Sequence, residues 1–173
     1  MNNPIFLSIE GSTQGLITEG AFTAESVGNS YQKGHENEAL LKGFSHNMNT
    51  PRDPHSGQVS GQREHKPFVI SKIIDKASPL INSALTTGET LTKVELKMWR
   101  TSYAGKPEHY YTVLLEDAIV VNIDAYMDIE VGAETSQVAP LENVSFSYRK
   151  ITWRHESAST EANDDSQKGV GLG

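Results

Sequence analysis

Ser78-Pro-Leu-Ile-Asn-Ser-Ala-Leu-Thr-Thr-Gly88 is the stretch that decides the fold, because it reads as one short helix between two strands. Pro79 suits the first helical position, where its missing N–H costs nothing, and Ser78 is placed to cap the first free amides. Apolar residues at spacings of four form a single stripe along the helix. Gly88 is predicted to end the helix in the left-handed backbone conformation. A helix this short is unstable alone in water, so it must pack its stripe against a sheet.

Apolar residues alternate with polar ones on both sides of this helix, which predicts strands. One strand begins near Phe68, and Lys93-Val-Glu-Leu-Lys-Met-Trp-Arg-Thr101 forms another. Asp117 is expected to be a bulge or a bend between two further strands. Seven or more strands with one helix predict a mainly β fold, either a sandwich or a barrel. The other expected strands are Ile5–Glu10, Ile17–Ala24, Ala39–Met48, His109–Glu116, Ala118–Tyr126 and Glu142–Trp153.

The chain divides into one folded domain and a tail. Its 173 residues are long enough for a single core. Residues 1–156 carry the strand and helix patterns. Residues 157–173 are small, polar and glycine-rich, which predicts a flexible, disordered tail.

Composition argues against several classes of protein. A formal net charge of −7, with scattered basic residues, argues against nucleic-acid binding. The sequence has no run of about 20 apolar residues that would span a membrane. The absence of cysteine excludes disulfides. The N-terminus lacks the basic and apolar regions of a cleavable signal peptide, so no general secretory leader is expected.

A long polar insertion separates two of the expected strands. Residues 50–62 hold two prolines and two glycines, and Val59 is the one apolar residue there to bury. An unstructured insertion of this length in a compact domain is often functional, although a mobile hairpin tip is the plainer interpretation. The charged residues 63–66 that follow are expected to anchor the base of the loop or to meet another chain.

The sequence carries no recognisable catalytic or metal-binding motif. The six histidines lie at least nine residues apart, so no local pair has the spacing of a metal site. We therefore expect no metal, no cofactor and no enzymatic activity. Two alternatives stay open. One is a β-barrel hydrolase that uses Glu64, His65 and His109, and the other is a monomeric carrier of a small ligand. Both should be compact monomers with an enclosed pocket.

Several segments, in one collinear order from about residue 4 to residue 156, resemble the Hcp (haemolysin-coregulated protein) family of the type VI secretion system. They are Ser8-Ile-Glu-Gly11, Gly15-x-Ile-Thr18, Gly28-Asn29, Ser60-Gly-Gln-Arg-Glu-His-Lys-Pro-Phe68, Val94-Glu-Leu-Lys-Met-Trp-Arg-Thr101 and Ser145-Phe-Ser-Tyr-Arg-Lys-Ile-Thr-Trp153.

The resemblance implies both a fold and an assembly. The fold would be a β-barrel of two antiparallel sheets flanked by one short helix, at about Ser78–Thr87. Six copies would form a ring, and rings would stack into a hollow inner tube. The tube would be built in the cytoplasm inside a contractile sheath and tipped by a spike protein. Sheath contraction would then carry it, with effector proteins, into a target cell without a cleavable signal peptide.

The resemblance also implies where subunits meet. In the family, the extended loop after the early strands contributes contacts between subunits or stacked rings. The polar side of the Leu41–Asn47 strand, with Ser45 and Asn47, is our candidate for lumen and cargo contact. The candidate contact residues in and beside the loop are Pro51, Arg52, Asp53, His55, Gln58, Gln62, Arg63, Glu64, His65 and Lys66.

Overall fold

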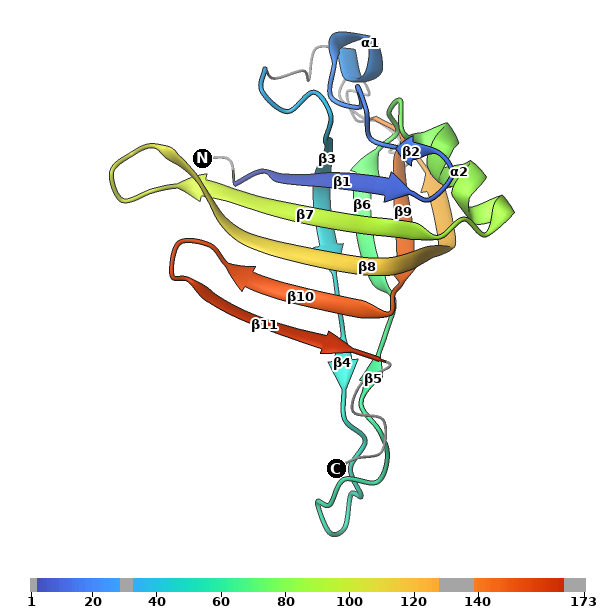
Figure 1. The fold of residues 1–173 in the computed structure, drawn as a ribbon, viewed down its shortest axis with the longest axis vertical. Helices are drawn as coiled ribbons and strands as arrows, with labels where there is room; N and C mark the ends of the chain where they lie inside the picture. The colour runs from blue at the N-terminus through green and yellow to red at the C-terminus, as the bar shows by residue number, and fades with distance from the viewer. Residues whose placement is uncertain (1–2, 29–32, 128–138, 167–173) are drawn as a thin grey trace, which may run out of the picture.

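The computed structural model describes residues 3–28, 33–127 and 139–166, which fold mainly as antiparallel β-structure (Figure 1). In chain order its elements are β1 (Ile5–Gly11), β2 (Gly15–Leu16), α1 (Ala24–Val27), β3 (Ala39–Ser45), β4 (Met48–Asn49), β5 (Glu64–His65), β6 (Phe68–Ile73), α2 (Ser78–Thr87), β7 (Leu91–Thr101), β8 (Pro107–Tyr126), β9 (Leu141–Ser147), β10 (Lys150–His155) and β11 (Thr160–Asp165).

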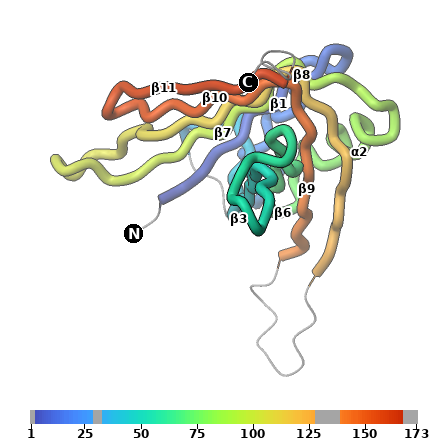
Figure 2. The backbone as a smooth tube through the Cα atoms, turned by 90° about the horizontal axis from the view of Figure 1, so that it is seen from below, coloured from blue at the N-terminus to red at the C-terminus, as the bar shows by residue number. Residues whose placement is uncertain are grey.

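The strands close into a barrel. The main sheet has the order β11-β10-β8-β7-β1-β3-β6-β9, and β9 also pairs with β8, which closes the path. Strands β10 and β11 continue the wall beyond β8, so the sheet overhangs the barrel (Figure 2). The predicted fold class, a mainly β-barrel flanked by one short helix, is confirmed.

Strand β8 belongs to both walls of the barrel. Residues as far as Ala118 pair with β7, and residues from Ile119 onward pair with β9. The change of partner occurs at Asp117, whose φ of 50° is in the left-handed region that aspartate tolerates better than most residues. Arg149 Nε donates to Asp117 Oδ2 over 2.8 Å and fixes this corner. The bend predicted at Asp117 is therefore present, within one continuous strand.

Helix α2 packs its apolar side into the core and lies beside β8 (Figure 1). Ile81 and Ala84 are buried, and Gly88 ends the helix with φ 69° and ψ 28°, as predicted. The core that they join comes from every wall of the barrel; among its fully buried members are Leu7, Ile9, Phe68, Ile70, Val94, Leu96, Leu115, Val144 and Phe146.

The predicted role of Ser78 as a helix cap is wrong. The N-cap residue is Ala77, and no side chain caps the helix. The Ser78 hydroxyl instead accepts from the Asp75 backbone N–H over 3.0 Å and donates to Glu142 Oε1 over 2.8 Å. Lys72 Nζ lies 2.8 Å from Asp75 Oδ1 and 2.7 Å from Glu142 Oε1, with all three side chains almost fully buried. A buried ionic cluster therefore holds the start of α2 to β6 and β9.

Two expected strands differ from the structure. Of the expected strand Ile17–Ala24, residues 17–23 form turns and Ala24 begins α1. The Ile9 N–H donates to the Thr18 hydroxyl, and the Ala21 N–H donates to the Thr18 carbonyl. The expected strand Glu142–Trp153 is two strands, β9 and β10. The chain bends between them because Arg149 N–H donates to the backbone carbonyls at the corner of β8.

The prediction of a disordered tail is wrong for residues 160–165. They form β11, which pairs with β10 along its whole length. Their sequence, Thr-Glu-Ala-Asn-Asp-Asp, has low intrinsic strand preference, so the pairing with β10 and not the local sequence makes this strand. Arg154 supports the pairing across the strands, with Nη2 2.7 Å from Glu161 Oε1. Residues 167–173 of the expected tail lie outside the described residues.

Among the described residues, no helix is both long and apolar enough to cross a membrane.

Candidate functional site

Residues 47–66 form a long arm that projects from the barrel (Figure 1). The arm leaves the barrel after β3 and returns at β6. Strands β4 and β5 pair at its base, with Met48 opposite His65 and Asn49 opposite Glu64. The Lys66 N–H donates to the Asn47 carbonyl over 2.9 Å and closes the base.

The outer part of the arm is an ordered hairpin and not the unstructured insertion expected from its composition. Arg52 and Val59 form an antiparallel bridge. Asp53 N–H donates to the Gln58 carbonyl over 2.7 Å, and Asp53 Oδ1 accepts from the His55 N–H over 2.7 Å. An aspartate that bonds the backbone two residues on is a common device of tight turns. These local bonds give the polar arm a defined shape without a core of its own.

Most of the predicted contact residues lie exposed along this arm. Val59 is 59% exposed and Met48 is 50% exposed, so the arm presents two apolar side chains among polar ones. The exposed predicted residues are Arg52, His55, Gln58, Gln62, Glu64 and Lys66, while Pro51, Asp53, Arg63 and His65 are partly buried.

The predicted charge cluster at residues 63–66 divides into two faces. Glu64 and Lys66 point to solvent, where Lys66 Nζ lies 3.6 Å from Glu64 Oε2. Arg63 and His65 point the other way and meet the end of β11. Alternate residues of a strand lie on opposite faces, which accounts for the division. One face of β5 is therefore presented to solvent, and the other anchors the arm.

Asp164 is the acceptor at this anchor. Its Oδ2 lies 2.6 Å from Arg63 Nε and 2.6 Å from His65 Nε2. The hydrogen bond from Arg63 holds the pKa of Asp164 below its usual range, and the bond with His65 acts in the same direction. Arg63 Nη2 also donates to the Asp165 carbonyl over 3.2 Å. The base of the arm is therefore bonded to both the side chain and the backbone of β11.

Tyr148 joins two histidines beside this anchor. Its hydroxyl oxygen lies 2.7 Å from His65 Nδ1 and 2.6 Å from His46 Nε2. Burial raises the pKa of Tyr148, so its hydroxyl keeps its proton. Burial also lowers the pKa of His46, and the neighbouring His65 lowers it further. The His46 ring packs against that of Phe68 at a tilt, with ring centroids 4.9 Å apart, which connects this group of side chains to the core.

A surface cavity of about 240 Å³ lies at this anchor. Two arginines line it, and both already have carboxylate partners. Arg63 is bonded to Asp164, and Arg149 Nη1 lies 2.6 Å from Asp165 Oδ2. The other lining residues are His65, Tyr148, Asp164 and Ser166. Because the positive groups here are neutralised within the chain, this cavity is better suited to hold the arm than to bind an anion.

The two lumen candidates lie between the barrel and the arm. Ser45 is the last residue of β3, and Asn47 begins the arm; both are exposed. Whether either side chain faces a lumen stays a prediction.

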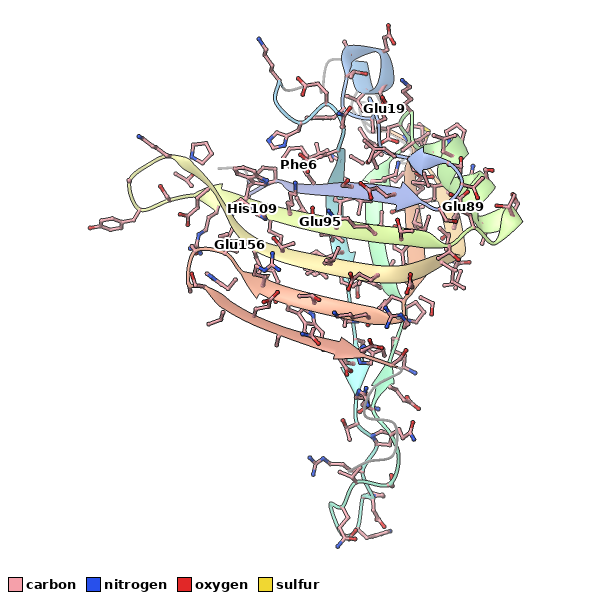
Figure 3. All side chains as sticks on the ribbon, viewed as in Figure 1. Phe6, Glu19, Glu89, Glu95, His109 and Glu156 are labelled. Carbon is pink, nitrogen blue, oxygen red and sulfur yellow. The ribbon has the colours of Figure 1, made fainter. Side chains whose placement is uncertain are left out.

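The hydrolase alternative has no geometric support. His65 contacts Tyr148 and Asp164 at one end of the β10–β11 hairpin, whereas His109 lies beyond the other end, 2.7 Å from the Thr112 hydroxyl. Figure 3 places His109 and Glu156 at the far end of the sheet from the arm. Within residues 3–28, 33–127 and 139–166, no group of three or more His, Asp or Glu side chains could hold a metal ion.

Sequence reasoning found the arm but missed most of its anchor. The composition around Asp164 predicts a disordered tail, and the alternation around Tyr148 predicts one continuous strand. His46 had no local partner in the sequence. Because His46, His65, Tyr148 and Asp164 come from distant positions, no spacing pattern could join them. Arg63 and His65 are two positions apart, so in an extended strand their side chains lie on the same face. This spacing was the one sign in the sequence that they act together.

Comparisons with known proteins agree with this architecture. The family model described as "Type VI secretion system effector, Hcp" matches residues 6–155. The "Major exported protein" of Pseudomonas aeruginosa is 56% identical over 165 residues, covering 95% of this chain and 96% of that protein. The solved structure of secreted protein Hcp3 from Pseudomonas aeruginosa is 51% identical with a TM-score of 0.81, covering 95% of this chain and 98% of that one.

A second solved structure, described as the crystal structure of an Hcp protein, is 46% identical and matches with a TM-score of 0.87. That match covers 94% of this chain and 98% of the other. The family model spans most of the chain, and the sequence and structure matches also cover almost all of it. The chain therefore belongs to the Hcp family of the type VI secretion system.

Proposed function

We propose that this protein is a structural subunit of the inner tube of a type VI secretion system. Six copies form a ring, and the rings stack into a hollow tube. The tube assembles in the cytoplasm within a contractile sheath, ends in a spike protein and carries effector proteins when contraction expels it. Membership of the Hcp family is the starting point of this proposal.

The arm is the observation that carries the proposal. It extends away from the barrel, its outer half is polar and exposed, and its base is anchored by Arg63 and His65. An ordered projection with little to bury within its own chain is suited to contact another copy. Polar contacts also suit a stack that must form and later come apart. Residues 51–62 therefore make the contact between successive rings in this proposal.

The overhanging wall of the sheet supports ring closure. Strand β11 is the last strand of the sheet order, so it presents an edge beyond the barrel. An open strand edge is an aggregation hazard unless something covers it. A ring of head-to-tail contacts joins two different faces of each copy and closes on itself, which would use such an edge.

The filled barrel argues against the carrier alternative. Leu7, Phe68 and Phe146 are no more than 1% exposed, and together with the other core residues they occupy the space between the walls. A carrier would need that space for its ligand. A hollow passage in this proposal comes from the ring and not from the barrel.

Removal of residues 51–60 tests the role of the arm. The deletion leaves Thr50, Gly61, Gln62 and Arg63 to join Asn49 to Glu64, which is long enough for a hairpin turn. Because the base of the arm is retained, the variant should fold and form rings. It should fail to form tubes, as judged by electron microscopy.

The matched control is Lys93→Gln, which removes a half-exposed charge on β7 and leaves both the arm and the edge strand β11 intact. This control should form rings and tubes like the parent protein. Tubes of normal length from the deletion variant would contradict the stacking role of the arm.

A further inference from the structure

Four side chains from separate segments form one continuous hydrogen-bonded row at the base of the arm. His46 lies 2.6 Å from the Tyr148 hydroxyl, which lies 2.7 Å from His65 Nδ1. His65 Nε2 lies 2.6 Å from Asp164 Oδ2. The row crosses from the end of β3, through β5, to β11. It therefore ties both strands of the arm's base to the body of the protein.

With both histidines neutral, each of the three bonds in the row has one donor and one acceptor. His46 Nε2–H donates to the Tyr148 oxygen, and the Tyr148 hydroxyl donates to His65 Nδ1. His65 Nε2–H then donates to Asp164. A neutral imidazole has one donor and one acceptor nitrogen, and a phenol both donates and accepts, so the three bonds run in one direction.

A single added proton is also accommodated. With that proton on His65, both of its nitrogens donate, one to Asp164 and the other to the Tyr148 oxygen. The Tyr148 hydroxyl then turns and donates to His46 Nε2, which accepts in the tautomer that carries its proton on Nδ1. All three bonds survive, and the two bonds of the Tyr148 hydroxyl reverse their direction.

A second proton breaks the row. Both histidines would then donate to the Tyr148 oxygen, and the phenol proton would have no acceptor in the row. Two positive rings would also face each other, with centroids 6.2 Å apart. His46 is half-buried, so its charge would be poorly hydrated there. Release of His46 and the adjoining arm into water relieves all three costs.

The charges around the row do not offset that second proton. Among the described residues, Asp164 is the one carboxylate bonded to the row, and it already neutralises Arg63, 2.6 Å away. Asp165 and Asp117 are bonded to Arg149. Glu64 lies on the exposed face of β5 and pairs with Lys66. Outside the row, the His46 ring lies against Phe68, which offers no charge.

We propose that His46, Tyr148, His65 and Asp164 form a latch that holds the arm at neutral pH and releases it in mild acid. The four are positioning residues for the arm. If the arm joins stacked rings, which rests on the proposed function, then neutral conditions favour tubes and mild acid favours their separation into rings.

The direction of the pH effect follows from His46. Its pKa is lowered in the latched state, and on release it returns to the ordinary value near 6.5. The released state therefore binds more protons, so the latch is fully stable above about pH 6.5 and weakens as pH falls below it. The pKa of Asp164 is also lowered in the latched state. The latch therefore loses further stability as the pH falls below about 3.9, the ordinary pKa of an aspartate.

Hydrogen exchange of the arm's base tests the latch in isolated rings. The Lys66 amide, bonded to Asn47, and the amides of β4 and β5 report release. Between pH 7.5 and pH 5, their protection, corrected for the intrinsic rate, should fall by up to about thirtyfold, the limit for one histidine that regains a pKa near 6.5. Amides of β1 and β7 should not change.

Two glutamine variants make the test specific. His46→Gln keeps a side-chain N–H donor for Tyr148 but cannot be charged, so its arm should stay protected at pH 5. His55→Gln, at the exposed tip of the arm, should keep the parent's pH response. Tyr148→Phe should lower protection at pH 7.5 and lose most of the pH response, because the two histidines are no longer joined.

A pH response of the same size in His46→Gln and in the parent would overturn the latch, and so would unchanged protection in the parent down to pH 5. Neither result depends on stacking. An intact latch response in rings that never form tubes would instead contradict the proposed role of the arm.

Discussion

Lys72 is the least expected residue in the molecule, since its side chain is fully buried in an acidic protein. Its ammonium is bonded to Asp75, Glu142 and the Ser78 hydroxyl, so its charge and its donors are satisfied. Burial raises the pKa of Asp75, whereas the nearby Lys72 charge opposes that rise. One cation between two carboxylates therefore makes a cluster in which each member depends on the others.

Lys72→Met should destabilise the protein strongly. The variant leaves Asp75 and Glu142 buried with no positive partner, and breaking a buried ion pair typically costs about 3–5 kcal/mol. Chemical denaturation would measure the change in the free energy of unfolding. The control Lys93→Met removes a half-exposed lysine 3.8 Å from Glu95 and should cost less than about 1 kcal/mol. Equal effects for the two variants would show that the buried cluster has no special role.

Single residues were predictable where local chemistry fixes their role, as with Gly88 at the end of α2 and Asp117 at a bend. Ser78 has the identity of a cap, but its hydroxyl is bonded to the Lys72 ammonium, the Asp75 backbone N–H and the Glu142 carboxylate. Those partners come from β6, the turn after it and β9. No local rule could have indicated those bonds.

Among the elements, α2 is one that the local sequence pattern is sufficient to predict. Its boundaries were predicted correctly from an apolar stripe, an early proline and a final glycine. Strand β11 shows the opposite case, because its polar sequence resembles a disordered tail and only its pairing with β10 makes it a strand. The anchor of the arm on Asp164 was invisible for the same reason.

Gly88→Ala tests the end of α2. The Gly88 φ of 69° is costly for a residue with a Cβ, although no atom lies within 4 Å of the position that a Cβ would take. We expect a loss of about 1 kcal/mol in the free energy of unfolding, from backbone strain alone. Asn82→Ala, at an exposed position within the same helix, should be neutral or slightly stabilising. No loss from Gly88→Ala would contradict the account of this helix end.

At the scale of the whole molecule, the mainly β fold and the family were accessible from the sequence, because strand alternation and collinear motifs extend along most of the chain. The closed path of strands, with one long strand in both walls, was not accessible. That arrangement depends on the corner between Asp117 and Arg149, which lie 32 positions apart. The assembly is a property of several chains, so it must be measured.

The mass in solution, measured by light scattering on a sizing column, tests the central claim most directly. A ring of six copies predicts a species near six times the 19.0 kDa chain, stable across a wide range of concentration. Rings that stack would add larger species at high concentration, and these should disappear when residues 51–60 are deleted. A monomer of 19.0 kDa at every concentration would contradict the ring, and with it the proposed tube.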